Sequence, residues 1–116
     1  MNTPVEPVPW TPVEATEKIR RYAREDNFSI SYTFHAKDQM ADRDLTTGDV
    51  LYVLKNGFVY EEAEAATQYG MFKYQMVCRT PNSNNRDIRV VTIPSPQACA
   101  AKVVTVMWVN EPIQGG

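Results

Sequence analysis

Metal-binding and redox residues are scarce in this sequence. Its 116 residues include one histidine, His35, and two cysteines, Cys78 and Cys99, which lie far apart along the chain. A structural zinc site needs four ligands, mostly cysteine and histidine. The sequence therefore predicts no metal site, and we expect no cofactor.

Long hydrophobic runs are missing as well. No apolar segment approaches the roughly 20 residues that a membrane-spanning helix requires. The N-terminus has no basic segment followed by an apolar core, which is the pattern of a signal peptide. We therefore expect no membrane partner and a cytoplasmic location, where both cysteines remain reduced thiols.

A basic excess, the usual mark of a nucleic-acid-binding protein, is also absent. The net charge is −2 and the isoelectric point is about 5.3. The overall charge argues against RNA or DNA as a partner but leaves room for a local basic face. The sequence contains no GxSxG, HExxH or glycine-rich phosphate loop, so no motif favours an enzyme that acts on a small metabolite.

What the sequence does contain is the composition of one globular domain, with 43% hydrophobic and 22% charged residues. The proline-rich residues 1–11 predict a flexible arm that Trp10 anchors to the body, because proline disfavours helix. Residues 111–116 predict a flexible polar tail. The folded domain is expected to span residues 12–110.

Helical patterns occupy the first half of the chain. The clearest helix spans residues 11–26, where Thr11 and Glu14 form a capping box and apolar residues recur on one face. Two shorter helices are expected at residues 35–43 and 47–56.

Cap residues mark both ends of the third helix. Thr46 and Asp49 are an N-cap pair that places a carboxylate in the first turn, where the helix dipole favours it. Gly57 follows the helix, and we expect it to adopt the left-handed conformation that commonly ends helices.

Strand patterns dominate the second half, and one short strand precedes the second helix. Residues 61–68 are compatible with either a helical turn or a loop. The last strand is β-branched and nearly continuous, which predicts a central strand covered on both faces. The fold class is therefore α+β, with N-terminal helices packed on an antiparallel sheet of about three or four strands. The expected strands are residues 28–33, 58–60, 71–80, 86–93 and 102–109.

His35 is the side chain best suited to proton transfer, because histidine titrates near neutral pH. It stands where the first strand gives way to a helix. Gln39 and Arg43 follow at intervals of four residues and share its flank. A local structural role for this histidine is the alternative.

Cationic side chains gather on the strands. Lys73 and Arg79 project from one face of their strand, and strand parity places Arg89 beside them. Such a row binds an RNA backbone through charge or forms the solvated side of a sheet, and both interpretations stay open. Tyr74 and Trp108 are able to stack on bases, although their apolar neighbours favour core packing.

Together these residues resemble a family of bacterial domains of unknown function, numbered 4258. The resemblance covers roughly residues 32–108. It is carried by His35-Ala36, Met40, Arg43, Leu45, Thr46-x-x-Asp49-Val50, Leu54-x-x-Gly57-x-Val59 and Val103-Val104-Thr105-Val106. The sequence departs from the family pattern at Asp44, where glycine is frequent, and at Gln39, where arginine is frequent.

That family in turn resembles the RelE, MqsR and barnase-like group of small metal-independent ribonucleases, many of them toxins of toxin–antitoxin pairs. The resemblance implies a RelE/barnase-like α+β fold, RNA as substrate and a cognate antitoxin as partner. It implies that His35 is the acid or base, Arg43 a phosphate clamp and Thr105 an RNA contact. Strand parity adds Arg79 as a third catalytic residue. Gln39, Lys73 and Arg89 complete the expected RNA-binding set.

Two hypotheses therefore remain. The first is a metal-independent endoribonuclease of toxin type. The second is a non-catalytic interaction domain with the same fold, which binds a protein partner through its arm or a sheet edge and fits the acidic isoelectric point better.

Overall fold

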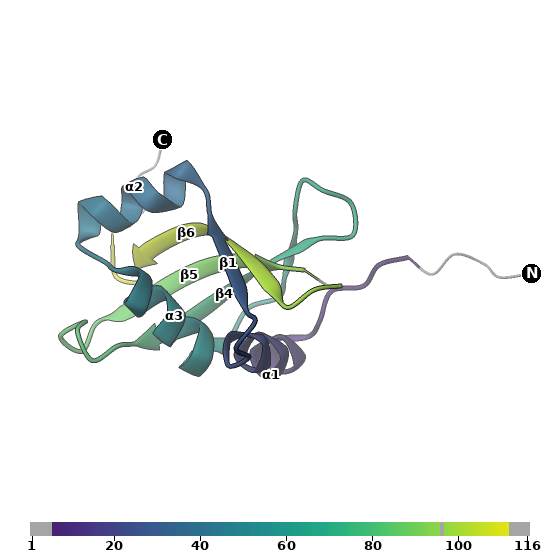
Figure 1. Ribbon diagram of the computed structural model, residues 1–116, viewed down its shortest axis with the longest axis horizontal. Helices are drawn as coiled ribbons and strands as arrows, with labels where there is room; N and C mark the ends of the chain where they lie inside the picture. The colour runs from purple at the N-terminus through teal and green to yellow at the C-terminus, as the bar shows by residue number, and fades with distance from the viewer. Residues whose placement is uncertain (1–5, 96, 112–116) are drawn as a thin grey trace, which may run out of the picture.

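The computed structural model describes residues 6–95 and 97–111, which form three α-helices and six β-strands (Figure 1). The prediction of an α+β fold is confirmed. The elements are α1 (Pro12–Ala23), β1 (Ser29–Tyr32), α2 (Phe34–Arg43), α3 (Thr47–Asn56), β2 (Phe58–Val59), β3 (Glu64–Ala65), β4 (Phe72–Arg79), β5 (Asp87–Pro94) and β6 (Ala100–Trp108).

The strands form one sheet in the order β1-β6-β5-β4-β2, and β3 also pairs with β4. The sheet thus has six strands rather than the three or four expected. The short strand expected at residues 58–60 is present as β2, whereas β3 lies in the segment expected to be a helical turn or a loop. The two strands follow one another along the same edge of β4. A strand of two residues, such as β3, leaves almost no period-two pattern for a sequence to display.

The pairing of β1 with β6 is parallel, whereas every other pair is antiparallel. The expectation of a purely antiparallel sheet was therefore wrong. Short loops favour antiparallel neighbours only between strands that are adjacent in sequence. Most of the chain separates β1 from β6, so no such constraint acts on this pair.

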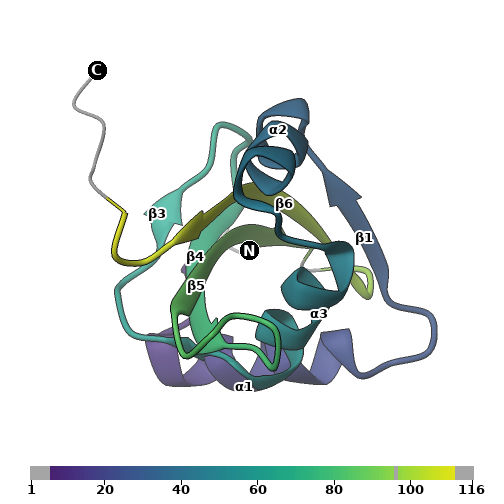
Figure 2. The same cartoon turned by 90° about the vertical axis from the view of Figure 1, so that its left-hand side faces the viewer.

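Helices α1 and α3 cover one face of the curved sheet. In Figure 2 the sheet curves around α3, and α1 lies across the bottom, below α3. The largest fully buried side chains of this core are Ile19, Leu54, Met76, Ile88, Val50, Val53, Val90, Val103 and Val106. The opposite face of β4, β5 and β6 carries no helix, and we call it the open face. On β6 the exposed Lys102 belongs to this face, so the prediction that β6 is covered on both faces was wrong.

Local capping signals begin two of the helices as predicted. Both capping boxes are present, at Thr11 with Glu14 and at Thr46 with Asp49. The end of α3 differs from the prediction, because Gly57 is extended, with φ −77° and ψ 179°. Glycine is needed there for space: a Cβ atom would lie 2.6 Å from the Val53 carbonyl oxygen.

The left-handed helix end occurs instead at Asp44, which follows α2 with φ 56° and ψ 38°. A left-handed residue other than glycine is disfavoured, although aspartate tolerates it better than most. Asp44, the expected departure from a frequent glycine, is thus the residue with the left-handed backbone at this helix end.

Trp10 packs on the body, as predicted. Its ring stacks on Tyr74 at a centroid distance of 5.5 Å, and its backbone N–H donates to the Tyr74 hydroxyl at 2.8 Å. Residues 1–5 and 112–116, on which much of the predicted arm and tail falls, lie outside the described residues. Within the described residues, no helix has the length and apolar character needed to cross a membrane.

Candidate functional site

The open face is a grid of side chains set by the pairing register of β4, β5 and β6. Side chains alternate between the two faces of a strand, and pairing aligns them in rows across the strands. The first row holds Lys73, Ile93 and Lys102; the second holds Gln75, Val91 and Thr105; the third holds Val77, Arg89 and Met107. Arg79 and Asp87 form the last row, at the far end of the strands.

Positive charge outweighs negative charge on these rows. The four cations Lys73, Lys102, Arg79 and Arg89 stand against two carboxylates. Asp87 lies 3.5 Å from Arg79, and Glu64 of β3 pairs with Lys73 at the end of the first row. Apolar side chains fill the positions between the cations. An acidic protein thus presents one locally basic face, which the net charge alone does not reveal.

Arg89 holds the central position of the third row, between Val77 and Met107. Its Nε atom is buried, and no described protein atom accepts a hydrogen bond from it. An unpaired buried donor costs about 1–3 kcal/mol, so buried polar groups normally have a partner. Arg89 as a whole is half-buried, and its terminal nitrogens are not buried as Nε is, so these are the donors that an incoming anion would meet.

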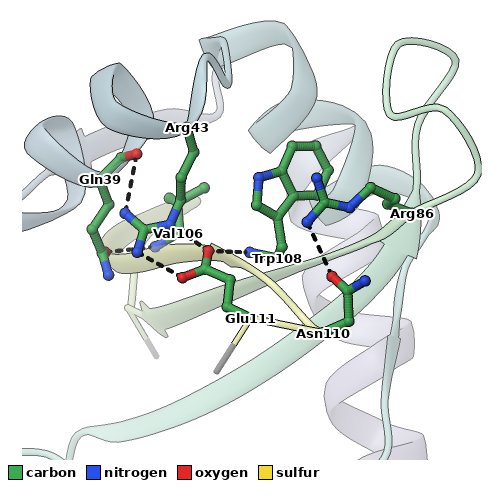
Figure 3. A network of polar contacts seen from close by, with 7 residues as sticks. All are labelled: Gln39, Arg43, Arg86, Val106, Trp108, Asn110 and Glu111. Atoms are coloured by element: carbon green, nitrogen blue, oxygen red, sulfur yellow. Dashed lines mark hydrogen bonds and ion pairs between the residues drawn. The ribbon is translucent and has the colours of Figure 1, made fainter. Parts of the chain in front are cut away.

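Helix α2 closes the edge of β6 beyond the point where β1 ends. Figure 3 shows Gln39 and Arg43 of this helix beside Val106 of β6. The Gln39 Oε1 atom accepts a hydrogen bond from the Val106 N–H at 2.9 Å. Glu111 accepts one from the Trp108 N–H at 2.8 Å. These two side chains take the place of a neighbouring strand for the last part of β6.

Arg43 holds Glu111 in this position. Its Nε atom bonds Glu111 Oε1, and its Nη2 atom bonds Oε2 at 2.7 Å. Hydrogen bonding to Arg43 lowers the pKa of Glu111 and, reciprocally, raises the pKa of Arg43. We call Gln39, Arg43 and Glu111 the edge clasp.

His35 is the second residue of α2 and is exposed to solvent. Helical periodicity places it on the flank of Gln39, one turn closer to the helix start. The Thr33 hydroxyl, just before α2, donates to the Val104 carbonyl at 3.4 Å, so this helix end lies against β6 near Val104. Arg43 is two turns away from His35, about 12 Å along the axis.

The sequence model of the family described as Domain of unknown function (DUF4258) matches residues 32–108. The chain belongs to this family. The match runs from Tyr32, the last residue of β1, through α2 and α3 to the end of β6, so it includes both the open face and the edge clasp except Glu111. No curated protein and no solved structure gives a significant match to the chain.

The predicted site residues of this DUF4258 domain fall into two groups. Lys73, Arg79, Arg89 and Thr105 share the open face. His35, Gln39 and Arg43 share one flank of α2. The two groups adjoin along β6, where Gln39 contacts the backbone of Val106, the residue after Thr105.

Sequence reasoning missed two residues of this region. Lys102 completes the first row, but its parity along the strand is opposite to that of Thr105, and only the irregularity at Val91/Thr92 brings both to the open face. Glu111 carried no local signal: it follows the last strand in a polar segment, and only folding brings it to Arg43.

Other candidate groups of the DUF4258 domain belong to the core side or lie apart. Tyr74 is buried, and Trp108 lies beneath the Arg86 guanidinium at 4.0 Å, so neither offers a stacking surface on the open face. Burial raises the pKa of Cys78, which makes its thiol a poor nucleophile. In the part of the chain that is described, no three His, Cys, Asp or Glu side chains gather as metal ligands would.

Proposed function

We propose that this DUF4258 domain binds single-stranded RNA on its open face and cleaves it without a metal ion. The observation that carries the proposal is the central Arg89, a half-buried guanidinium without a hydrogen-bond partner within the described protein, on a face with an excess of cations. Phosphate oxygens are acceptors of the required charge. The resemblance to RelE, MqsR and barnase-like ribonucleases points to the same substrate.

In the proposed reaction a base removes the proton of a ribose 2′-OH, and that oxygen attacks the adjacent phosphorus. The bond from phosphorus to the 5′-oxygen breaks, and an acid protonates this leaving oxygen. The products are a 2′,3′-cyclic phosphate and a 5′-hydroxyl. No metal or oxidant is needed to balance the step.

We assign His35 to one of the two proton transfers, because it is the only histidine and is exposed beside β6. Arg89 stabilises the negative charge that develops on the phosphate. Arg79, in the last row beside Asp87, contacts the strand farther along. Lys73 and Thr105 hold the neighbouring backbone. The Arg43 guanidinium is paired with the Glu111 carboxylate. In this scheme Arg43 binds phosphate only when that ion pair breaks.

Binding is tested by titrating a short non-cleavable RNA while following backbone amide shifts at low and moderate salt. We expect shifts at Lys73, Arg89 and Thr105. Each phosphate contact to a single strand contributes about −0.7 to the slope of log K against log salt. Contacts from the two lysines of the first row and Arg89 therefore predict a slope near −2.

Cleavage is tested on single-stranded RNA in the presence of a chelator. His35→Ala is expected to abolish cleavage while leaving RNA affinity and folding intact, and Lys37→Ala, at an exposed position of the same helix, is the control. Undiminished cleavage by folded His35→Ala protein would remove His35 from the mechanism. Unshifted open-face amides at low salt would refute the RNA proposal as a whole.

A second candidate function is a non-catalytic interaction domain whose partner is an antitoxin or another protein. One observation favours it: Phe58 and Tyr60, at the β2 edge, are 48% and 69% exposed, with ring centroids 6.0 Å apart. Exposed aromatic pairs are typical of protein interfaces. The test is calorimetric binding of the product of an adjoining small reading frame, which Tyr60→Ser should weaken at least tenfold.

A further inference from the structure

The turn between β3 and β4, residues 66–71, folds over one end of the open face and encloses a slot. Two hydrogen bonds shape the turn: Ala66 N–H donates to the Met71 carbonyl at 2.9 Å, and Met71 N–H donates to the Gln68 carbonyl at 3.1 Å. Figure 1 shows this segment rising away from α1 and α3. The slot has a volume of about 380 Å³, within the range of small-molecule sites.

The lining of the slot combines apolar walls with cations and one side-chain amide. Ile93 and Val104 come from the sheet, and Met71 comes from the turn. Gln68 and the Thr67 hydroxyl provide hydrogen-bonding groups opposite the sheet. Lys73 and Lys102 complete the lining, which contains no acidic residue.

The charge of the two lysines remains available to a ligand. They occupy the outer strands of the first row, so two strand spacings, about 10 Å, separate their backbones. The acid nearest in register is Glu64, which pairs with Lys73 across β3 and β4. No ion pair joins them, since the ion pairs within the described residues are Arg43–Glu111 and Arg79–Asp87.

We propose that this slot holds one nucleobase of the bound strand, with the adjoining phosphate between Lys73 and Lys102. The inference rests on the RNA function proposed above and assigns it a base-recognition site. A flat base fits between the apolar side chains of the sheet and the Met71 thioether, which contacts aromatic rings favourably. The Gln68 amide both donates and accepts hydrogen bonds, as the edge of a base requires.

The slot and the proposed cleavage site are separate positions on one path. Ile93 and Arg89 both belong to β5 and face the same side, four residues or about 13 Å apart. A strand anchored by one base in the slot thus continues across the second row toward Arg89 and Thr105. Binding in the slot can therefore be measured without cleavage.

The test titrates the full chain with each of the four nucleoside 5′-monophosphates, ribose 5-phosphate and inorganic phosphate, following backbone amide shifts. We expect at least one nucleotide to bind about tenfold tighter than ribose 5-phosphate, with shifts at Thr67, Gln68 and Val104. Gln68→Ala should remove most of this tenfold gain, because the side-chain amide that contacts the edge of the base is lost. The variant should still fold, since Gln68 is exposed and lies outside the core.

Lys102→Gln should weaken every phosphate-bearing ligand about fivefold, whereas Lys37→Gln, an exposed lysine on α2, should change nothing. Equal affinity for the nucleotides and ribose 5-phosphate would overturn the base site, as would shifts confined to the surroundings of Trp10 and Tyr69. In either case, RNA-induced shifts at Arg89 would leave the proposed function standing. No open-face shift with nucleotides or RNA would overturn both.

Discussion

The edge clasp makes the sharpest prediction about this fold. In Glu111→Gln the carboxylate that accepts from Arg43 and from the Trp108 N–H is lost. The side chains of Arg43 and Glu111 are only 23% and 16% exposed, so water replaces these bonds poorly. Leaving one partner of a largely buried, hydrogen-bonded charge pair unmatched costs about 2–5 kcal/mol. Because both side chains remain partly exposed, we expect the free energy of unfolding of Glu111→Gln to fall by about 1.5–3 kcal/mol relative to the wild type.

Urea unfolding at pH 7 measures this loss. With a denaturant slope of about 1.5 kcal/mol per molar, within the usual range for small proteins, the midpoint should fall by about 1–2 M at unchanged slope. Glu62→Gln is the matched control, because Glu62 is exposed. A double-mutant cycle with Arg43→Met should show a coupling of about 1–3 kcal/mol.

The effect should also depend on pH in a defined direction. The pKa of Glu111 is lowered in the folded state, chiefly by its hydrogen bond to Arg43. The stability that the Glu111 carboxylate contributes is therefore fully present above the pKa of a glutamate in the unfolded chain, about 4.3. This stability is lost as pH falls through the lower pKa of the folded state. The stabilities of the wild type and Glu111→Gln should converge in acid. Two results would refute this account of the clasp. One is a difference in unfolding free energy between wild type and Glu111→Gln of less than about 0.5 kcal/mol at pH 7. The other is a difference that stays constant down to pH 3.

The same variant separates two roles of Arg43. If Arg43 only closes the edge of β6, Glu111→Gln lowers stability and leaves RNA affinity unchanged. If Arg43 also clamps phosphate, freeing it raises RNA affinity while stability falls. Measuring both properties on one protein distinguishes these cases.

Three further predictions concern single residues, each measured by urea unfolding. Gly57→Ala should lower the free energy of unfolding by about 2–3 kcal/mol, because its Cβ would lie 2.6 Å from a backbone carbonyl oxygen. The control is Gly48→Ala, whose Cβ would lie 3.5 Å from its nearest neighbour; it should be neutral or slightly stabilising. Asp49→Ala should lower the free energy of unfolding by about 2–4 kcal/mol, because the buried carboxylate accepts hydrogen bonds from Thr46 and Thr80. Its control, Asp38→Ala at an exposed position, should change that free energy by no more than about 0.5 kcal/mol. Asp44→Gly should raise stability by about 0.5–1 kcal/mol, since φ is 56° at this helix end.

Much of the candidate site was accessible to sequence reasoning, because strand parity is local. Alternation along residues 71–80 and 86–93 predicted that Lys73, Arg79 and Arg89 share a face, and the pairing of β4 with β5 places them so. Parity does not say which residues of a distant strand stand beside them. The register of β6, including the irregularity at Val91/Thr92, was needed to add Lys102 and Thr105 to the same grid.

The sequence by itself determined the α+β class, the three helices and the caps that begin α1 and α3. Each of these depends on side chains within a few residues of one another, through capping hydrogen bonds and apolar periodicity. Only the tertiary structure decided the parallel pairing of β1 with β6, the extended Gly57 and the clasp of Gln39, Arg43 and Glu111. Those features depend on which segments meet across 37 to 71 residues of chain, as in the bonds from Arg20 to Gly57 and from Thr33 to Val104. Global packing selects such contacts, and no short stretch of sequence encodes them.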